Sequence, residues 1–252
     1  MLAQPHAIHY LPLLTTCVSI AFFFTLIQRY RMKKRGAHLL WWAAGVACYG
    51  LGTAIESSIT VFGNSVFLTK SWFIAGALLG GYPLAQGTVY LLLRRRTANR
   101  LTLLTVPIIV VAAVCVALSP VDLDSLQAAR PSGSLLQWQW IRSGFTPIIN
   151  VYSLVFLVGG AMLSAIRFGR FAVTRHRAIG NTLIAIGAFL PAIGGGMTKF
   201  FELVEALYVA ELAGLVMIWF GYASCVHRPN GVSQEVGDLT AVRPATIPSR
   251  TL

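Results

Sequence analysis

The chain has 252 residues, of which 56% are hydrophobic and only 11% are charged, and its mean hydropathy is +0.70. Soluble globular domains carry about 25% charged residues, so this composition excludes an ordinary soluble protein. The formal net charge of +12 would suggest a nucleic-acid-binding protein if the chain were soluble, but the positions of the charges fit membrane topology, and we expect no nucleic-acid partner.

Seven apolar segments follow one another along the chain. Each has about the length that a helix needs to cross the hydrocarbon core of a bilayer. We therefore predict an all-α fold, a polytopic membrane protein whose seven-transmembrane-helix bundle forms one domain over residues 1–226 within the lipid bilayer. The predicted helices cover approximately 7–27, 39–61, 71–93, 101–118, 147–166, 179–198 and 203–225. Residues 227–252 are rich in Pro, Ser, Thr and Val without an apolar period, which predicts a disordered tail.

The basic residues predict the orientation of this bundle. Of the 20 Lys and Arg residues, 16 follow the first, third and fifth segments or lie in the tail, and the other four are Lys70, Arg130, Arg142 and Lys199. Cytoplasmic connections carry an excess of Lys and Arg, so we expect the N-terminus outside and the C-terminus in the cytoplasm. No basic residue precedes the first segment, which favours an uncleaved helix over a signal peptide. We expect a multi-pass protein of a bacterial inner (cytoplasmic) membrane.

Ionisable residues inside or beside the predicted helices gather in the outer third of the bundle. Charged groups within a membrane are costly and often functional, so they predict an outward-facing polar pocket that binds a ligand or a proton. The alternative is an ion-pair cluster that only ties helices together. Together with one tyrosine on the same helix face, the predicted site residues are Glu56, Lys70, Lys199, Glu205, Tyr208 and Glu211.

Small residues and one proline mark the faces where helices are expected to approach closely. Two glycines four residues apart in the third segment permit close backbone contact. A proline followed by three glycines in the sixth segment predicts a hinge, and the alternative is a static kink on a tight packing face. These packing or hinge residues are Gly76, Gly80, Pro191, Gly194, Gly195 and Gly196.

We expect no metal, no cofactor and no catalytic residues. His6 and His9 are three residues apart, but two ligands alone make a weak metal site. No histidine pair lies at mid-membrane to hold a haem, and the seventh segment has no lysine for a retinal Schiff base. The chain also has no nucleophile–base pair, phosphate loop or zinc motif, so we do not predict an enzyme.

One stretch of about residues 30–95 resembles a known family. It contains Arg35-Gly-Ala-His-Leu-Leu-Trp-Trp through Tyr49-Gly-Leu-Gly-Thr-Ala-Ile-Glu56, then Lys70-Ser-Trp72, Gly76 and Pro83. These motifs resemble the seven-helix N-terminal sensor region of some bacterial histidine kinases and diguanylate cyclases. The signalling members of that family continue into a kinase or cyclase, whereas here a tail of about 25 residues follows the last segment. The resemblance therefore implies a sensor that signals to a separate partner.

These observations favour a receptor-like function. A small molecule or lipid would enter the outer pocket, shift the sixth and seventh helices, and be read by a partner at the cytoplasmic basic loops. One alternative is a small proton-coupled transporter with 3+1+3 helices that uses the same carboxylates. Another is a structural subunit of a larger membrane complex. The sequence does not name the ligand or the partner.

Overall fold

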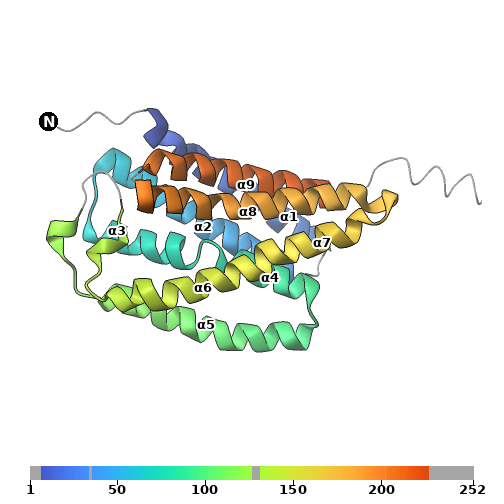
Figure 1. Cartoon of the computed structure of the whole chain (residues 1–252), viewed down its shortest axis with the longest axis horizontal. Coiled ribbons are helices and arrows are strands. Elements are labelled where there is room, and N and C mark those ends of the chain that lie inside the picture. Colours follow the sequence, from blue (N-terminus) through green and yellow to red (C-terminus); the bar gives the residue numbers. More distant parts are fainter. Residues whose placement is uncertain (1–6, 34–35, 127–130, 202, 227–252) are drawn as a thin grey trace, which may run out of the picture.

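The computed structural model describes residues 7–33, 36–126, 131–201 and 203–226, which form an elongated bundle of helices (Figure 1). Within these ranges no strand is present, and a single antiparallel bridge joins Val121 and Leu136. The predicted tail 227–252 lies outside the described residues. The α-helices are α1 (Leu11–Lys33), α2 (Ala37–Phe62), α3 (Val66–Trp72), α4 (Tyr82–Leu92), α5 (Arg95–Leu118), α6 (Thr146–Ser153), α7 (Gly160–Gly169), α8 (Arg175–Phe201) and α9 (Val204–Val226).

Shorter helical turns connect or extend these helices. Three are π-helical, namely η2 (Phe73–Leu78), η5 (Ile141–Phe145) and η6 (Leu154–Gly159). Because η5, α6, η6 and α7 follow one another without a break, they form one long helix over Ile141–Gly169. Four are 3-10 turns, namely η1 (Ala7–Tyr10), η3 (Leu123–Ser125), η4 (Gly133–Leu135) and η7 (Ala172–Thr174).

The described residues include six helices that are long and apolar enough to cross a membrane. They cover Ile8–Lys33, Ala37–Phe62, Arg95–Leu118, Ile141–Gly169, Ala172–Thr198 and Val204–Val226. Large apolar side chains are exposed on their outer surfaces, such as Phe62 at 84% and Leu103 at 77%. Extended apolar surface of this kind is typical of a protein that lies in lipid. The all-helical fold predicted from the sequence is therefore present in the described residues, with six helices of this kind, and the predicted count of seven is not confirmed.

The remaining predicted helix, 71–93, is not continuous in the structure. The chain runs from α3 through the π-helix η2, bends at Leu79–Gly81, and starts again as α4. At Gly80 an added Cβ atom would lie 2.5 Å from the carbonyl oxygen of Gly76, so only glycine fits the bend. Pro83 lies in the first turn of α4, where its missing N–H group costs no helical hydrogen bond. Gly80, Gly81 and Pro83 thus divide one apolar segment into two helices.

The other predicted helices are present with different ends. The first extends to Lys33, and the fourth, expected at 101–118, starts at Arg95. The fifth, expected at 147–166, belongs to the longer helix over Ile141–Gly169. Apolar length locates the middle of each helix but not its ends, because the polar residues at both ends continue the helical backbone.

The connections lie at the two ends of the bundle. Figure 1 shows the α4–α5 and α7–α8 connections and the end of α9 at one end, and the α2–α3, α5–α6 and α8–α9 connections at the other. The first end therefore carries the arginines of 94–100 and 167–177. The segment from α3 to α4 runs from one end to the other.

Helices α8 and α9 form a hairpin whose backbones touch. Added Cβ atoms on Gly187 and Gly214 would each lie 2.5 Å from the other residue's carbonyl oxygen, and Gly180 and Gly221 face each other in the same way. Glycines seven residues apart recur on one face of a helix, so the contact repeats along the hairpin. Contacts through small residues are a main source of helix association in membranes.

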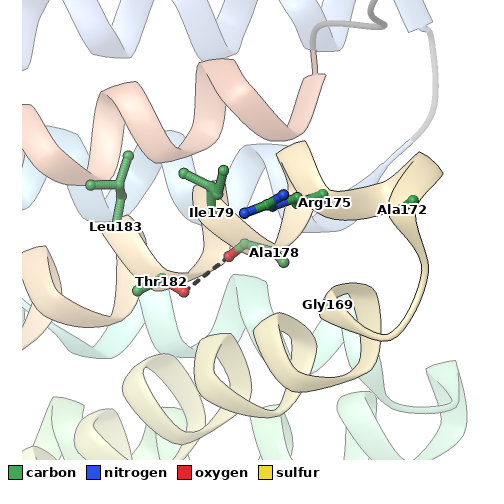
Figure 2. Close-up of a pocket in the computed structure, with 7 residues that line it drawn as sticks. All are labelled: Gly169, Ala172, Arg175, Ala178, Ile179, Thr182 and Leu183. Carbon is green, nitrogen blue, oxygen red and sulfur yellow. Dashed lines mark hydrogen bonds between the residues drawn. The ribbon is translucent and has the colours of Figure 1, made fainter.

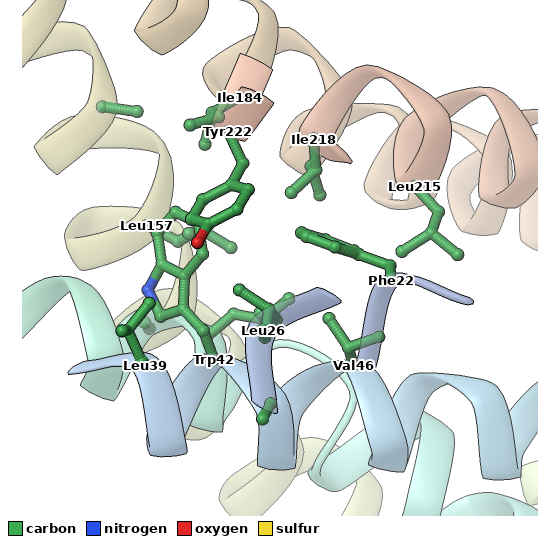
Figure 3. Close-up of a cluster of buried hydrophobic side chains, with 14 of the residues drawn as sticks. Phe22, Leu26, Leu39, Trp42, Val46, Leu157, Ile184, Leu215, Ile218 and Tyr222 are labelled. Carbon is green, nitrogen blue, oxygen red and sulfur yellow. The ribbon is translucent and has the colours of Figure 1, made fainter. Parts of the chain in front are cut away.

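A cluster of apolar side chains joins this hairpin to α1, α2 and η6 (Figure 3). Phe22 of α1 is fully buried and stacks on Trp219 of α9, with ring centroids 5.6 Å apart. Trp42 of α2 and Tyr222 of α9 are also neighbours, at 5.9 Å. The cluster fills the half of the bundle that contains the end of α9.

Helix α5 is held against the bundle by polar contacts. Gln86 of α4 is fully buried, and its amide donates to the Thr102 hydroxyl of α5 at 2.7 Å. The Tyr152 hydroxyl of α6 donates to the carbonyl oxygen of the Gln86 side chain. Tyr82 and Thr105 share a further hydroxyl contact at 2.7 Å. These bonds add to the apolar contact that Ile109, Ala112 and Val116 of α5 make with the rest of the bundle.

The α8–α9 contact predicts the effect of adding one methyl group. Gly214→Ala places a Cβ atom against the backbone of α8 and should destabilise the fold by about 1–3 kcal/mol, as overpacking does. In the matched control Gly159→Ala, the new Cβ atom meets nothing within 4 Å, so stability should stay equal or rise. Thermal unfolding in mild detergent measures both variants. An unchanged midpoint for Gly214→Ala would contradict backbone contact between α8 and α9.

Candidate functional site

A cavity of about 550 Å³ lies between α2, η2, the bend before α4, the helix of α6 and η6, and the α8–α9 hairpin. Its walls contain two carboxyl groups, Glu56 of α2 and Glu211 of α9, and two aromatic side chains, Tyr49 and Trp72. The two acids lie six residues from the end of α2 and seven from the start of α9, about 9–10 Å along each helix.

Small residues and irregular helices account for this space. Gly76 of η2, Gly80 of the bend and Gly195 of α8 all line it. An added Cβ atom on Gly195 would meet nothing within 4 Å, so the glycine leaves open volume. The π-helical turns η2 and η6 both supply walls, and such turns are frequent at functional sites.

Glu56 is a buried acid with a dedicated hydrogen-bond donor. Its residue is 2% exposed. The indole Nε1–H of Trp72 donates to its Oε1 atom at 2.7 Å. The donor comes from α3 and the acceptor from α2, so the bond fixes the start of the interrupted segment against α2.

Glu211 meets Glu56 from the opposite side of the cavity. The Tyr49 hydroxyl donates to the backbone oxygen of Glu211 at 3.0 Å, which joins α2 to α9. Both carboxyl groups line the same cavity, and no described basic side chain lies in its wall. Two negative charges in one apolar cavity repel each other, which favours a state in which one of the two acids keeps its proton. We therefore treat the arrangement as a carboxyl pair with one proton and one negative charge.

The carboxyl pair retains unused acceptor capacity. Oε2 of Glu56 and Oε2 of Glu211 are buried and have no donor among the described residues. No Lys, Arg or His side chain is among the described residues that line the cavity. Buried acceptors without donors are unfavourable, so the site is built to receive hydrogen-bond donors.

The other residues predicted for this site lie elsewhere. Lys70 Nζ donates at 2.8 Å to the backbone oxygens of Ala117 and Ser119, where it caps the C-terminal end of α5. Glu205 lies 3.9 Å from His9 Nε2. Tyr208 also contacts the His9 ring, with centroids 6.0 Å apart. The structure does not describe the Lys199 side chain.

The six predicted residues do not form one pocket, since four of them fall into two groups. Glu56 and Glu211 come together in the cavity, whereas Glu205 and Tyr208 form a separate contact with η1 through His9. Lys70 belongs to neither group, because its ammonium group donates to carbonyl oxygens at the end of α5 and does not line the cavity. Residues on one helix face were grouped by sequence, but different neighbouring elements pack against that face.

The predicted hinge residues from Pro191 to Gly196 lie within α8, which is continuous from Arg175 to Phe201. Pro191 lines the cavity. Gly194 packs against α9, where an added Cβ atom would lie 2.8 Å from the Cα atom of Leu207. At Gly195 and Gly196 the corresponding space is open. The run of glycines therefore combines a contact with α9 and open space beside it.

Several polar cavity residues could not be identified from the sequence. Thr53, Asn150 and Ser153 line the cavity but have no distinctive spacing in the chain. Trp72 belongs to the Lys70-Ser-Trp72 motif, but its role as a donor to Glu56 follows only from the fold.

A second pocket of about 340 Å³ lies at the α7–α8 connection (Figure 2). Gly169, Ala178, Ile179 and Leu183 contribute to its apolar lining, and the Thr182 hydroxyl donates to the backbone oxygen of Ala178. Its one ionisable side chain among the described residues is the exposed Arg175. None of the polar side-chain atoms of its described residues is buried without a hydrogen-bond partner. Unlike the cavity with the carboxyl pair, this pocket therefore has no unsatisfied acceptor that a ligand would complete.

The described residues form an all-helical protein with six helices long and apolar enough to cross a membrane and a pair of carboxyl groups in a cavity between helices. No family model matches the chain, and no match was found among curated proteins or solved structures. The resemblance to seven-helix sensor regions therefore stays a prediction.

The bond from Trp72 to Glu56 predicts a specific loss of stability. Trp72→Phe keeps an aromatic ring but removes the indole donor, which leaves a buried carboxyl oxygen short of one hydrogen bond. We expect a loss of about 1–3 kcal/mol in the free energy of unfolding. The matched control Trp140→Phe changes a half-exposed tryptophan and should stay within about 0.5 kcal/mol. Unfolding by SDS titration in mixed micelles measures both, and equal stabilities would show that Glu56 does not depend on the indole.

Proposed function

We propose that the protein is a receptor-like membrane module that binds a small molecule in the cavity between Glu56 and Glu211. The observation that carries this proposal is a pair of carboxyl groups in a cavity of about 550 Å³, each with one buried oxygen that has no donor among the described residues. Cavities of about 300–1,000 Å³ are typical of small-molecule sites. Intramembrane acids that face such a cavity mark ligand or ion sites in many membrane proteins.

The proposal includes a topology. The interrupted segment over 66–92 is the seventh crossing, the N-terminus is outside, and the C-terminus is cytoplasmic in a bacterial inner membrane. Support comes from the basic residues at one end of the bundle and from the path of α3 to α4 between the two ends. The cavity is then nearer to the outer face, as the depth of its two acids indicates.

The hairpin of α8 and α9 offers a route for a signal. Pro191 and Gly195 of α8 and Glu211 of α9 form one side of the cavity, and the contact of their backbones makes them move together. If the hairpin has two conformational states, a ligand that binds one state more tightly than the other shifts the population toward that state. A separate partner at the basic, cytoplasmic end reads the shift and takes the place of the kinase or cyclase that follows the sensor region in the signalling members of the resembled family.

Filling the cavity tests the proposal. Gly195→Leu adds a side chain where an added Cβ atom meets nothing within 4 Å, so the fold should persist while the cavity loses volume. Native mass spectrometry of the wild-type protein in mild detergent should show a retained small molecule, and Gly195→Leu should lose it. Gly144→Leu is the matched control, since that glycine also has open space and does not line the cavity. Bare wild-type protein that no added small molecule stabilises would contradict the proposal.

A proton-coupled transporter is the second candidate, and two acids in one cavity without a basic side chain in its described wall favour it, since such a pair can hold and release a proton. A transporter would exchange that proton for substrate as the cavity opens to each side in turn. A structural subunit of a membrane complex also stays a prediction, but no contact in the described residues favours it.

Uptake into proteoliposomes distinguishes a transporter from a receptor. If the protein is a transporter, the molecule retained by the wild-type protein should be taken up at a rate that depends on pH. Glu211→Gln removes the exchangeable proton, so its uptake should lose that dependence while the retained molecule still binds. Absence of uptake in liposomes that contain folded, ligand-binding protein would exclude transport of this molecule and leave the receptor proposal.

A further inference from the structure

Apart from the side-chain amide of Asn150, the hydrogen-bond donors of the described residues that line the cavity are already engaged by the protein. Trp72 donates to Glu56, and Tyr49 donates to the backbone of Glu211. The Ser153 hydroxyl donates to the backbone oxygen of Ile149, and the Thr198 hydroxyl to that of Gly194. The Thr53 hydroxyl has the backbone oxygen of Gly50 and the Thr16 hydroxyl as partners.

The free polar atoms are mainly acceptors. Oε2 of Glu56 and Oε2 of Glu211 are buried without donors, and the pair carries a negative charge that no described basic side chain in the wall neutralises. An anionic ligand would meet like charge and few free donors, so the wall disfavours it. A ligand with N–H groups and one positive charge satisfies both the acceptors and the charge.

The aromatic residues fit the same ligand. Tyr49 and Trp72 line the cavity beside the acids. An organic cation gains from contact with aromatic rings, most of all where water is excluded. Apolar residues such as Leu154 and Leu157 complete the wall and suit a hydrocarbon portion.

We propose that the cavity takes a small organic monocation with N–H donors, a protonated amine or amidine, held between the carboxyl groups of Glu56 and Glu211 and beside Tyr49 and Trp72. This inference rests on the proposed function, because it names the chemical class of the ligand of the same site. If one acid keeps its proton because two negative charges in one cavity repel each other, the pair has a single negative charge, and a single positive charge balances it.

Three probes of nearly the same size separate the ligand classes. They are 2-phenylethylamine, which is cationic at pH 7, neutral 2-phenylethanol and anionic phenylacetate. Isothermal titration calorimetry of the purified protein in detergent measures the affinity for each probe. The amine should bind about tenfold or more tightly than the alcohol, because it adds a charged hydrogen bond. Phenylacetate should not bind. Gly195→Leu should abolish binding of the amine, which assigns it to this cavity.

Glutamine variants distinguish a charge requirement from a proton requirement. Glu56→Gln or Glu211→Gln alone resembles the protonated acid, because the amide can donate to the remaining carboxylate and one negative charge stays. Each single variant should therefore keep amine affinity within a few-fold of wild type. The double variant is neutral and should lose about tenfold or more in amine affinity, while its 2-phenylethanol affinity stays the same. Unfolding midpoints of all three variants verify that the fold is intact.

The outcomes separate this inference from the proposed function. The cation inference is overturned if 2-phenylethanol or phenylacetate binds as tightly as the amine or more tightly, and Gly195→Leu weakens that binding. The small-molecule site itself would then remain in place. Full amine affinity in the folded double variant would also overturn it. Absence of amine binding overturns the inference, and the mass and charge of the molecule retained by wild-type protein then decide the proposed function separately.

Discussion

Two carboxyl groups buried in an apolar bundle impose the constraint on which the rest of this structure depends. A polar group in hydrocarbon must find its partner within the protein, so Glu56 and Glu211 bring partners from several helices to one place. The Trp72 indole ties α3 to α2, the Tyr49 hydroxyl ties α2 to α9, and the two carboxyl groups line the same cavity. Elements that are far apart in the chain are thereby joined at the same depth.

The irregular helices of the bundle are found around this pair rather than at random. The segment that bends at Leu79–Gly81 and the π-helical turns η2 and η6 all contribute to the cavity. Non-helical backbone inside a membrane is tolerated where it lines a cavity or is covered by protein. Regular helices would pack side chains into this space, so the departures from regularity account for its existence.

The sequence predicted the helices well because apolar length is a local property. It also placed Glu56 and Glu211 at similar depth, which is why both belong to the predicted site. It did not predict the break in 71–93, although Gly80, Gly81 and Pro83 are the residues that end one helix and begin another. The sequence also did not predict that Lys70 bonds the end of α5, or which donors surround the cavity. Both depend on which elements are neighbours in the fold, and a local sequence pattern does not indicate this.

The backbone contact between α8 and α9 has a geometric consequence for the cavity. Helices that touch at Gly187 and Gly214, and again at Gly180 and Gly221, cannot slide or rotate separately without a clash. The side of the cavity formed by Pro191, Gly195 and Glu211 therefore moves as one rigid body. The hydrogen bond from the Tyr49 hydroxyl to the backbone of Glu211 links this rigid body to α2. The width of the cavity then depends on one movement, the tilt of the α8–α9 hairpin relative to α2.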